Sequence, residues 1–227
     1  MKNKYYIGWD VGAWNCDKNK SSKDAFIIID NKDRILGQFR GNCRELINKA
    51  DSYKEIIKAI FPDLEIEYAN SEFIVAIDTP LGFSKDFLNL LIHNTYQREI
   101  NSFKENPYLY RETERYLFNK GYNPLSAINH MIGSQATKGI HFVSKYAGLC
   151  KSTGVWQSKD QNLTIIETYP SINKSIAIPE SISNTHFDLK DAYICACVAK
   201  VFDENINLLH LPSKAVDSRE GWIFFLK

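Results

Sequence analysis

One run of apolar residues constrains the fold of this chain more than any other feature. Residues 72–78 read Glu-Phe-Ile-Val-Ala-Ile-Asp, with apolar side chains in unbroken succession between the two acids. A strand covered on one face alternates apolar and polar residues, whereas a near-continuous apolar run is typical of a central strand buried on both faces. Such a strand needs helices on both sides of its sheet, so the sequence predicts a layered α/β domain.

The segments before this run predict an antiparallel meander followed by a helix. Three apolar runs read as strands, joined by a polar turn within residues 16–24 and by Asn31-Lys32-Asp33; the runs are residues 4–11, 25–30 and 34–39. Residues 43–61 carry apolar side chains at helical spacing, and Pro62 ends the pattern. The first strand is therefore expected beside the second, and the second beside the third.

The remaining chain predicts helices and parallel strands. Helices are expected at residues 85–93, 108–119, 125–149 and 189–201, of which the third could be broken at Gly133 and Gly139. A strand is expected at 163–169, and the tail at 221–226 could form a last strand. The predicted fold is a single domain over residues 1–227. It combines the three-strand meander with parallel βα units in a mixed five-stranded sheet, with helices on both faces and a helical insertion at roughly 81–124 after the fourth strand.

Composition agrees with a globular protein and excludes several classes. The 227 residues are 44% hydrophobic and 24% charged, enough to bury a core without disulfides, and the net charge of +1 indicates no global field for a polyanion. The five cysteines form no C-x-x-C pair and no zinc spacing, so we expect free thiols in a cytoplasmic protein. We expect neither a signal peptide nor a membrane segment, because no long apolar run is present.

Acidic residues fall where the predicted buried strands end. Asp10 ends the first strand, Asp78 ends the fourth, and Glu167 lies in the fifth. Asp188 and Asp191 are three residues apart at the start of the last long helix, so they share a face. Ligand sites gather at the carboxyl ends of strands in open α/β sheets, and carboxylates are hard ligands for Mg²⁺ or Mn²⁺. We therefore predict a metal site of Asp10, Asp78, Asp188 and Asp191, with Asp10, Asp78, Asp191 and Glu167 as catalytic candidates.

Each acid also has an ordinary structural explanation. Asp10 can cap a turn, Asp78 can end a strand before Thr-Pro, Asp188 can cap the helix, and Asp191 can interact with the helix dipole. Glu167 can be a buried functional acid or an outward-facing strand residue. Their joint placement at two strand ends and one helix start is what favours a site.

Five short motifs occur in a fixed order along the chain. They are Ile77-Asp78-Thr79-Pro80-Leu81-Gly82-Phe83, Arg111-Glu112-Thr113-Glu114-Arg115, Glu167-Thr168-Tyr169-Pro170, Asp191-Ala192-Tyr193-Ile194-Cys195-Ala196 and Glu220-Gly221-Trp222-Ile223. Together they resemble the domain-of-unknown-function family 429, described as predicted ribonuclease H-like nucleases. The resemblance covers nearly the whole chain and implies a ribonuclease H-like fold.

The resemblance also implies roles for particular residues. In the ribonuclease H-like superfamily the acids come from the first strand, the fourth strand and the last helix, the places of Asp10, Asp78 and Asp191 here. Asp188 with Asp191 is similar to the two acids near the last helix of Holliday-junction resolvases. His186 lies near a histidine often seen before the Asp-Ala pair in the family.

Basic residues suggest where a phosphate backbone could bind. No Asp or Glu occurs between Tyr116 and Lys159, a stretch in which lysines, including Lys138 and Lys145, alternate with aromatic residues. This pattern indicates either a nucleic-acid surface or a basic helix whose aromatics face the core. Arg111 and Arg115 are one helical turn apart and could grip a phosphate or pair with neighbouring glutamates. The predicted substrate-binding residues are Arg111, Arg115, Lys138, Lys145 and His186.

The sequence favours a Mg²⁺- or Mn²⁺-dependent nuclease that cleaves DNA or RNA by a two-metal mechanism. Two alternatives remain: a non-catalytic module that binds nucleic acid or a nucleotide, and a phosphotransferase on the related actin-like fold. The second normally needs a duplicated core and glycine-rich phosphate loops. The motifs of P-loop, dinucleotide-binding and serine-hydrolase proteins do not occur in the sequence.

Overall fold

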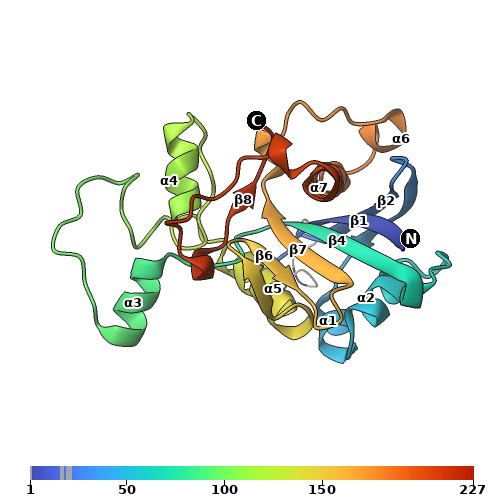
Figure 1. Ribbon diagram of the computed structural model, residues 1–227, viewed down its shortest axis with the longest axis horizontal. Helices are drawn as coiled ribbons and strands as arrows, with labels where there is room; N and C mark the ends of the chain where they lie inside the picture. Colours follow the sequence, from blue (N-terminus) through green and yellow to red (C-terminus); the bar gives the residue numbers. More distant parts are fainter. Residues whose placement is uncertain (1, 16–17, 19–21) are drawn as a thin grey trace.

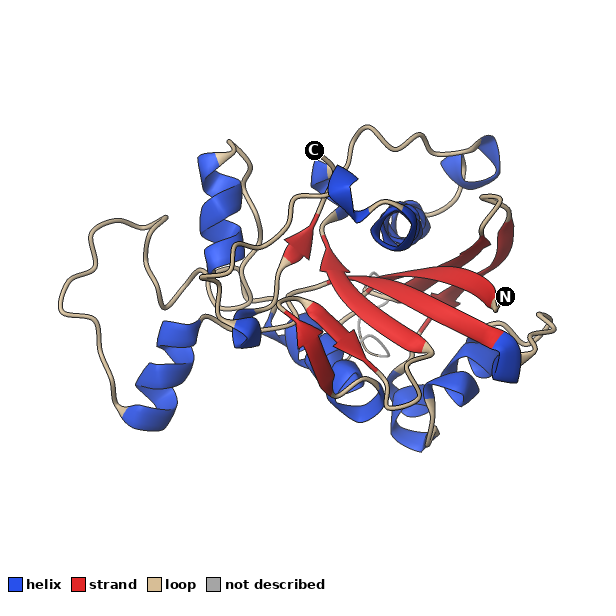
Figure 2. Cartoon of the chain, in the orientation of Figure 1, coloured by secondary structure: helices blue, strands red, loops and turns tan. Residues whose placement is uncertain are grey.

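One mixed sheet runs through the computed structural model, which describes residues 2–15, 18 and 22–227 (Figures 1 and 2). In this part of the chain the sheet has eight strands, of which seven follow the order β3-β2-β1-β4-β7-β6-β5 and β8 pairs with β7. The strands are β1 (Asn3–Asp10), β2 (Asp24–Asp30), β3 (Ile35–Gly41), β4 (Ser71–Asp78), β5 (Leu149–Ser152), β6 (Val155–Gln157), β7 (Leu163–Thr168) and β8 (Ile223–Phe224). The predicted α/β class is confirmed.

The first three strands form the predicted antiparallel meander. β1 pairs antiparallel with β2, and β2 with β3, while β4 lies parallel to β1 on its other edge. β7 continues the sheet parallel to β4. The polar turn expected within residues 16–24 falls largely outside the described residues, and β2 begins at Asp24.

The predicted number of five strands is wrong, because a hairpin and a short strand extend the sheet. β5 and β6 form an antiparallel hairpin around a turn in which Gly154 adopts a positive φ of 77°. β6 also pairs antiparallel with β7. Segments this short carry no usable periodicity, so the sequence placed residue 149 at the end of a helix. β8 pairs in parallel with the end of β7, beyond the residues that β6 covers.

Helices cover both faces of the sheet, as predicted. α1 (Arg44–Lys49), α2 (Tyr53–Ile60) and α5 (Gly133–Tyr146) pack on the face that contains Trp9, whereas α7 (Phe187–Glu204) packs on the opposite face. The single helix predicted at residues 43–61 is wrong: the backbone extends at Ala50, and the Ser52 side chain caps α2 by accepting from the backbone N–H of Glu55. Among the described residues, the shorter helical segments are α6 (Glu180–Ser183) and four 3₁₀ turns; the turns are Tyr68–Asn70, Pro170–Ile172, Ile206–Leu208 and Ser218–Glu220.

The segment after β4 contains the two expected helices outside the sheet. α3 (Lys85–His93) begins at Ser84, whose hydroxyl accepts from the backbone N–H of Phe87, and ends at Asn94 in the left-handed conformation. α4 (Glu112–Asn119) follows an irregular stretch. α3 has no buried residue and extends away from the sheet (Figure 1).

Among the described residues, no helix combines the length and apolar character needed to cross a membrane. Four cysteines in the described part of the chain are free thiols, namely Cys43, Cys150, Cys195 and Cys197, whereas Cys16 lies outside it.

α7 lies unusually close to β1. A Cβ atom added to Gly8 would come within 1.8 Å of the backbone oxygen of Ala192 and 2.4 Å of the backbone nitrogen of Ala196. Only a residue without a side chain therefore allows this approach. This close approach packs the middle of α7, around Ala192 and Ala196, directly against β1.

Gly8→Ala is expected to destabilise the fold by about 3 kcal/mol or more, because α7 must move away from β1 to admit the methyl group. Urea unfolding followed by circular dichroism measures the change. Gly133→Ala is the control, since the nearest atom to its Cβ would be 3.7 Å away, and it should change the unfolding free energy by about 1 kcal/mol or less. Equal stability of Gly8→Ala and the wild type would contradict this packing.

Candidate functional site

Asp10 and Asp78 are direct neighbours on adjacent parallel strands. They form the last register pair of β1 and β4, whose backbones run about 4.8 Å apart. Alternate residues of a strand share a face, and Ile74 and Ala76 of β4 belong to the core under α7. Both carboxylates therefore lie on the α7 side of the sheet, at its carboxyl edge.

The first turns of α7 bring two further acids toward this pair. His186 occupies the N-cap position, so Asp188 is not the cap that its sequence context also allowed. Asp188 is buried and Asp191 is partly exposed. The charges of both act on Asp10, which places the four predicted metal ligands in one electrostatic neighbourhood.

These carboxylates disfavour each other's ionisation. Burial, followed by the charges of Asp78, Asp188 and Asp191, raises the pKa of Asp10 to about 9. Burial raises the pKa of Asp78 well above its ordinary value, and the charge of Asp191 adds to the effect. Burial and the charge of Asp188 also raise the pKa of Asp191. A nearby cation would relieve this repulsion.

Three of the acids have no compensating partner in the described part of the chain. Asp10, Asp78 and Asp191 make neither a hydrogen bond nor an ion pair with any described residue. Thr79, next to Asp78, is only 5% exposed, and its side-chain oxygen is buried without a hydrogen-bond partner in the described part of the chain. Buried polar atoms are nearly always satisfied, so this group is expected to meet a ligand or water.

A cavity of about 160 Å³ opens beside this pair. Asp10, Asp78, Thr79 and Gln135 are its polar lining near the strand ends. Apolar residues from several elements form much of the remaining wall, and they include Val11, Pro80, Leu125, Ile132 and Ile223. The acids thus border a partly apolar pocket rather than a flat, fully hydrated surface.

The described residues contain no ready-made group of three or more His, Cys, Asp or Glu side chains arranged to hold a metal ion. Mg²⁺ commonly uses one or two protein carboxylates and completes its shell with water and substrate oxygens. The pair formed by Asp10 and Asp78 supplies that smaller number of ligands.

Arg40 is a residue at this site that the sequence did not single out. It pairs in register with Ala25, which pairs with Asp10, so Arg40 and Asp10 lie in one row across the sheet. Its Nε donates to Oδ2 of Asp188 over 2.8 Å. The one sequence signal for Arg40 was the expected meander, because it places the end of the third strand near the end of the first.

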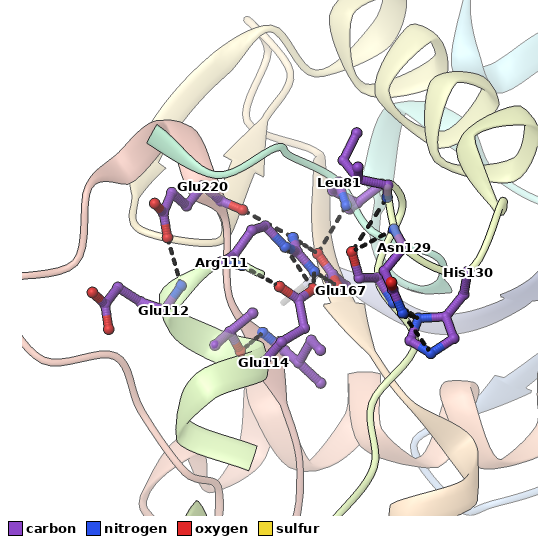
Figure 3. A network of polar contacts seen from close by, with 12 residues as sticks. Leu81, Arg111, Glu112, Glu114, Asn129, His130, Glu167 and Glu220 are labelled. Carbon is purple, nitrogen blue, oxygen red and sulfur yellow. Dashed lines mark hydrogen bonds and ion pairs between the residues drawn. The ribbon is translucent and has the colours of Figure 1, made fainter. Parts of the chain in front are cut away.

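Glu167 has a structural role that its sequence context did not reveal. Both of its carboxylate oxygens accept hydrogen bonds from Arg111, at 2.8 Å from Nη1 and 2.6 Å from Nη2 (Figure 3). The backbone N–H of Leu81 donates to the same carboxylate over 2.8 Å. Glu167 faces the pocket wall, but its charge is compensated by Arg111, unlike the charges of Asp10 and Asp78.

Arg111 is a buried structural residue, so its prediction as a substrate-binding residue is wrong. All five of its guanidinium N–H groups are engaged, with Glu114, with Glu167 and with the backbone oxygen of Glu220 (Figure 3). The Glu220 carboxylate in turn accepts the backbone N–H groups of Lys85 and Glu112. With Leu81, which donates to Glu167, four of the five sequence motifs thus meet here as internal contacts.

The predicted basic surface is also wrong at its central lysine. Lys138 is fully buried, and its Nζ lies 2.5 Å from Oδ2 of Asp24. Lys145 donates to the backbone oxygen of Ile47 over 2.7 Å, and Arg115 pairs with the exposed Glu112 over 2.6 Å. Aromatic side chains of α5 face the core, as the alternative interpretation of the stretch proposed. Of the predicted substrate-binding residues, His186 is the one that lies beside the acids.

Comparisons with models of protein families, with curated proteins and with solved structures found no match for this chain.

The raised pKa of Asp10 predicts a pH-dependent stability in the absence of divalent cations. The folded protein keeps a proton on Asp10 up to about pH 9, whereas the unfolded chain releases it near the ordinary Asp value of about 3.9. The unfolded state therefore binds fewer protons between these values, and the unfolding free energy decreases as the pH rises. We expect melting temperatures in EDTA to fall from about pH 5 to about pH 9, and Asp10→Asn to flatten this slope.

Asp160→Asn is the matched control for this measurement. Although burial opposes the effect, hydrogen bonds from Ser158, Asn162 and Tyr53 lower the pKa of Asp160 to about 2. Its contribution is therefore constant above about pH 5, and the variant should keep the wild-type slope. Identical slopes in all three proteins would contradict the assignment of the titration to Asp10.

Arg111→Met is expected to destabilise the protein by about 3–5 kcal/mol, because Glu114 and Glu167 would remain buried without their cation. Arg115→Met, which breaks a pair with an exposed partner, should cost about 1 kcal/mol or less. Urea unfolding of both variants gives the comparison. A fully stable Arg111→Met variant with weakened nucleic-acid binding would restore Arg111 to the substrate surface.

Proposed function

We propose that this chain is a divalent-cation-dependent nuclease of the ribonuclease H-like type, related to the domain-of-unknown-function family 429. The observation that carries the proposal is the register of Asp10 opposite Asp78, with both carboxylates unpaired within the described chain and Asp191 approaching from α7. The antiparallel meander joined to the parallel strands β4 and β7 supports the proposed fold type.

The proposed metal ligands come from three different elements of the fold. Asp10 and Asp78 provide anionic oxygens from adjacent strand ends, and Asp191 provides a third from the facing helix. When Mg²⁺ or Mn²⁺ is bound, it supplies Lewis-acid activation of the phosphate and of the attacking water.

The proposed substrate is a phosphodiester of DNA or RNA. Because Arg111 and Lys138 are occupied inside the protein, they contribute nothing to the grip on the backbone. The proposed contacts are instead limited to groups near the acids, including His186, whose side chain is 38% exposed. A binding module without catalysis would also bind a cation at these acids, so cleavage must be measured beside binding.

Asp10→Asn is expected to abolish nuclease activity while keeping or raising the melting temperature in EDTA, because the amide has nearly the same shape and needs no proton at a position where the folded state must keep Asp10 protonated. Mg²⁺ at a hundred times its dissociation constant should stabilise the wild type by about 2.7 kcal/mol and the variant much less. Thermal melts with and without metal, beside cleavage assays on mixed DNA and RNA, test both parts.

Asp63→Asn, at an exposed position, is the control and should behave as the wild type. A lower melting temperature of Asp10→Asn in EDTA, with equal shifts of both proteins by metal, would make Asp10 a structural turn residue. Stabilisation of the wild type by metal without any cleavage would favour the non-catalytic binding module.

A further inference from the structure

Arg40 reaches the acidic site from the strand end opposite Asp78. Two strand spacings separate it from Asp10, so the Cα atoms of Arg40 and Asp10 are about 10 Å apart. Phe39 packs against Phe26 in the core under α1 and α2, and Arg40 therefore lies on the α7 face with Asp10. A cationic side chain thus flanks a cluster that is otherwise acidic.

Asp188 and His186 hold the guanidinium group from one side. Nε of Arg40 lies 2.8 Å from Oδ2 of Asp188, and Nη2 lies 3.2 Å from Nε2 of His186. Nδ1 of His186 is 3.2 Å from the other oxygen of Asp188. Nη1 of Arg40 has no hydrogen-bond partner among the described residues, and a quarter of the side chain is exposed, at 25%.

We propose that Arg40 binds the phosphate group of the substrate at the Asp10–Asp78 site, and that Asp188 positions Arg40 rather than binding the cation. This proposal rests on the proposed function. A guanidinium offers donors along more than one edge, so the edge held by Asp188 and His186 leaves Nη1 for a phosphate oxygen. Asp188 already contacts Arg40 and His186 through its two oxygens, so ligating a cation would disrupt these contacts.

The charge of the cluster explains why such a residue is needed. Asp10, Asp78 and Asp191 repel an anionic substrate wherever their charges are not fully compensated. A cation bound by these acids and the Arg40 guanidinium beside Asp188 would face the phosphate from two sides. Arg40 is therefore a substrate-binding residue in this proposal, and Asp188 is a positioning residue.

The test measures anion binding and cation binding separately. Isothermal titration calorimetry with inorganic phosphate, with and without Mg²⁺, is compared with titration of an oligodeoxynucleotide that lacks terminal phosphates. The two anions distinguish a site for a free or terminal phosphate from one for an internal phosphodiester. Mn²⁺ binding is titrated independently in the absence of both anions.

Arg40→Gln should weaken binding of at least one of these anions tenfold or more in the presence of Mg²⁺, and change Mn²⁺ affinity less than threefold. Arg40→Lys keeps a positive charge next to Asp188 but loses the forked donors of the guanidinium group. This variant should therefore fold normally and still bind the anion more weakly than the wild type. Arg34→Gln is the matched control: Arg34 pairs with Asp30 over 2.6 Å at the other end of the sheet, and its loss should leave both titrations unchanged.

Asp188→Asn separates the two roles of that carboxylate. It should keep the Mn²⁺ affinity within threefold of the wild type and lower the affinity for the anion, whereas Asp10→Asn should abolish Mn²⁺ binding. Loss of Mn²⁺ binding in Asp188→Asn, or unchanged affinity for both anions in the folded Arg40 variants, would overturn the inference while leaving the proposed function intact.

Anion binding that depends on Arg40 in a protein that binds no Mn²⁺ would support the inference and refute the metal-dependent function. A wild type that binds neither anion nor cation would refute both.

Discussion

The parallel pairing of β1 with β4 decides where the charges of this protein meet. The same ladder that aligns the apolar residues of two buried strands sets Asp10 opposite Asp78 at its last step. Shifting the register by one residue would turn a strand's side chains to the other face, so the core fixes the position of the carboxylates. α7, seated on Gly8, then holds Asp188 and Asp191 near that edge. The repulsion among the acids is offset by the burial of the surrounding apolar side chains.

A second buried network fixes the segments around the same edge. Arg111 joins α4 to β7 and to the segment before β8, and Glu167 also holds the backbone of Leu81 shortly after Asp78. A buried ion network of this kind contributes little net stability compared with apolar packing. Its directional bonds nevertheless restrict the path of the chain as it leaves β4, and with it the position of Asp78.

The sequence predicted the elements that carry the candidate site better than the partners of its side chains. Strong apolar runs located the strands that end at Asp10 and Asp78, and the last helix was found because its apolar pattern is long. The hairpin of β5 and β6 was missed, since strands of four and three residues show no periodicity. The burial of Lys138 beside Asp24 was missed because these residues are 114 positions apart, and no local pattern encodes such a pairing.

The pairing of the acids separates structural carboxylates from candidate ligands. Lys138 compensates the fully buried Asp24, Arg111 compensates Glu114 and Glu167, and Arg40 compensates Asp188. Asp10, Asp78 and Asp191 lack any such partner in the described part of the chain. The fold pairs Asp24, Glu114, Glu167 and Asp188 with cations but leaves these three partly exposed acids uncompensated at one edge of the sheet. Because mutual repulsion of partly desolvated carboxylates is destabilising, their concentration at one place is physically reasonable where a cation from solution completes the site.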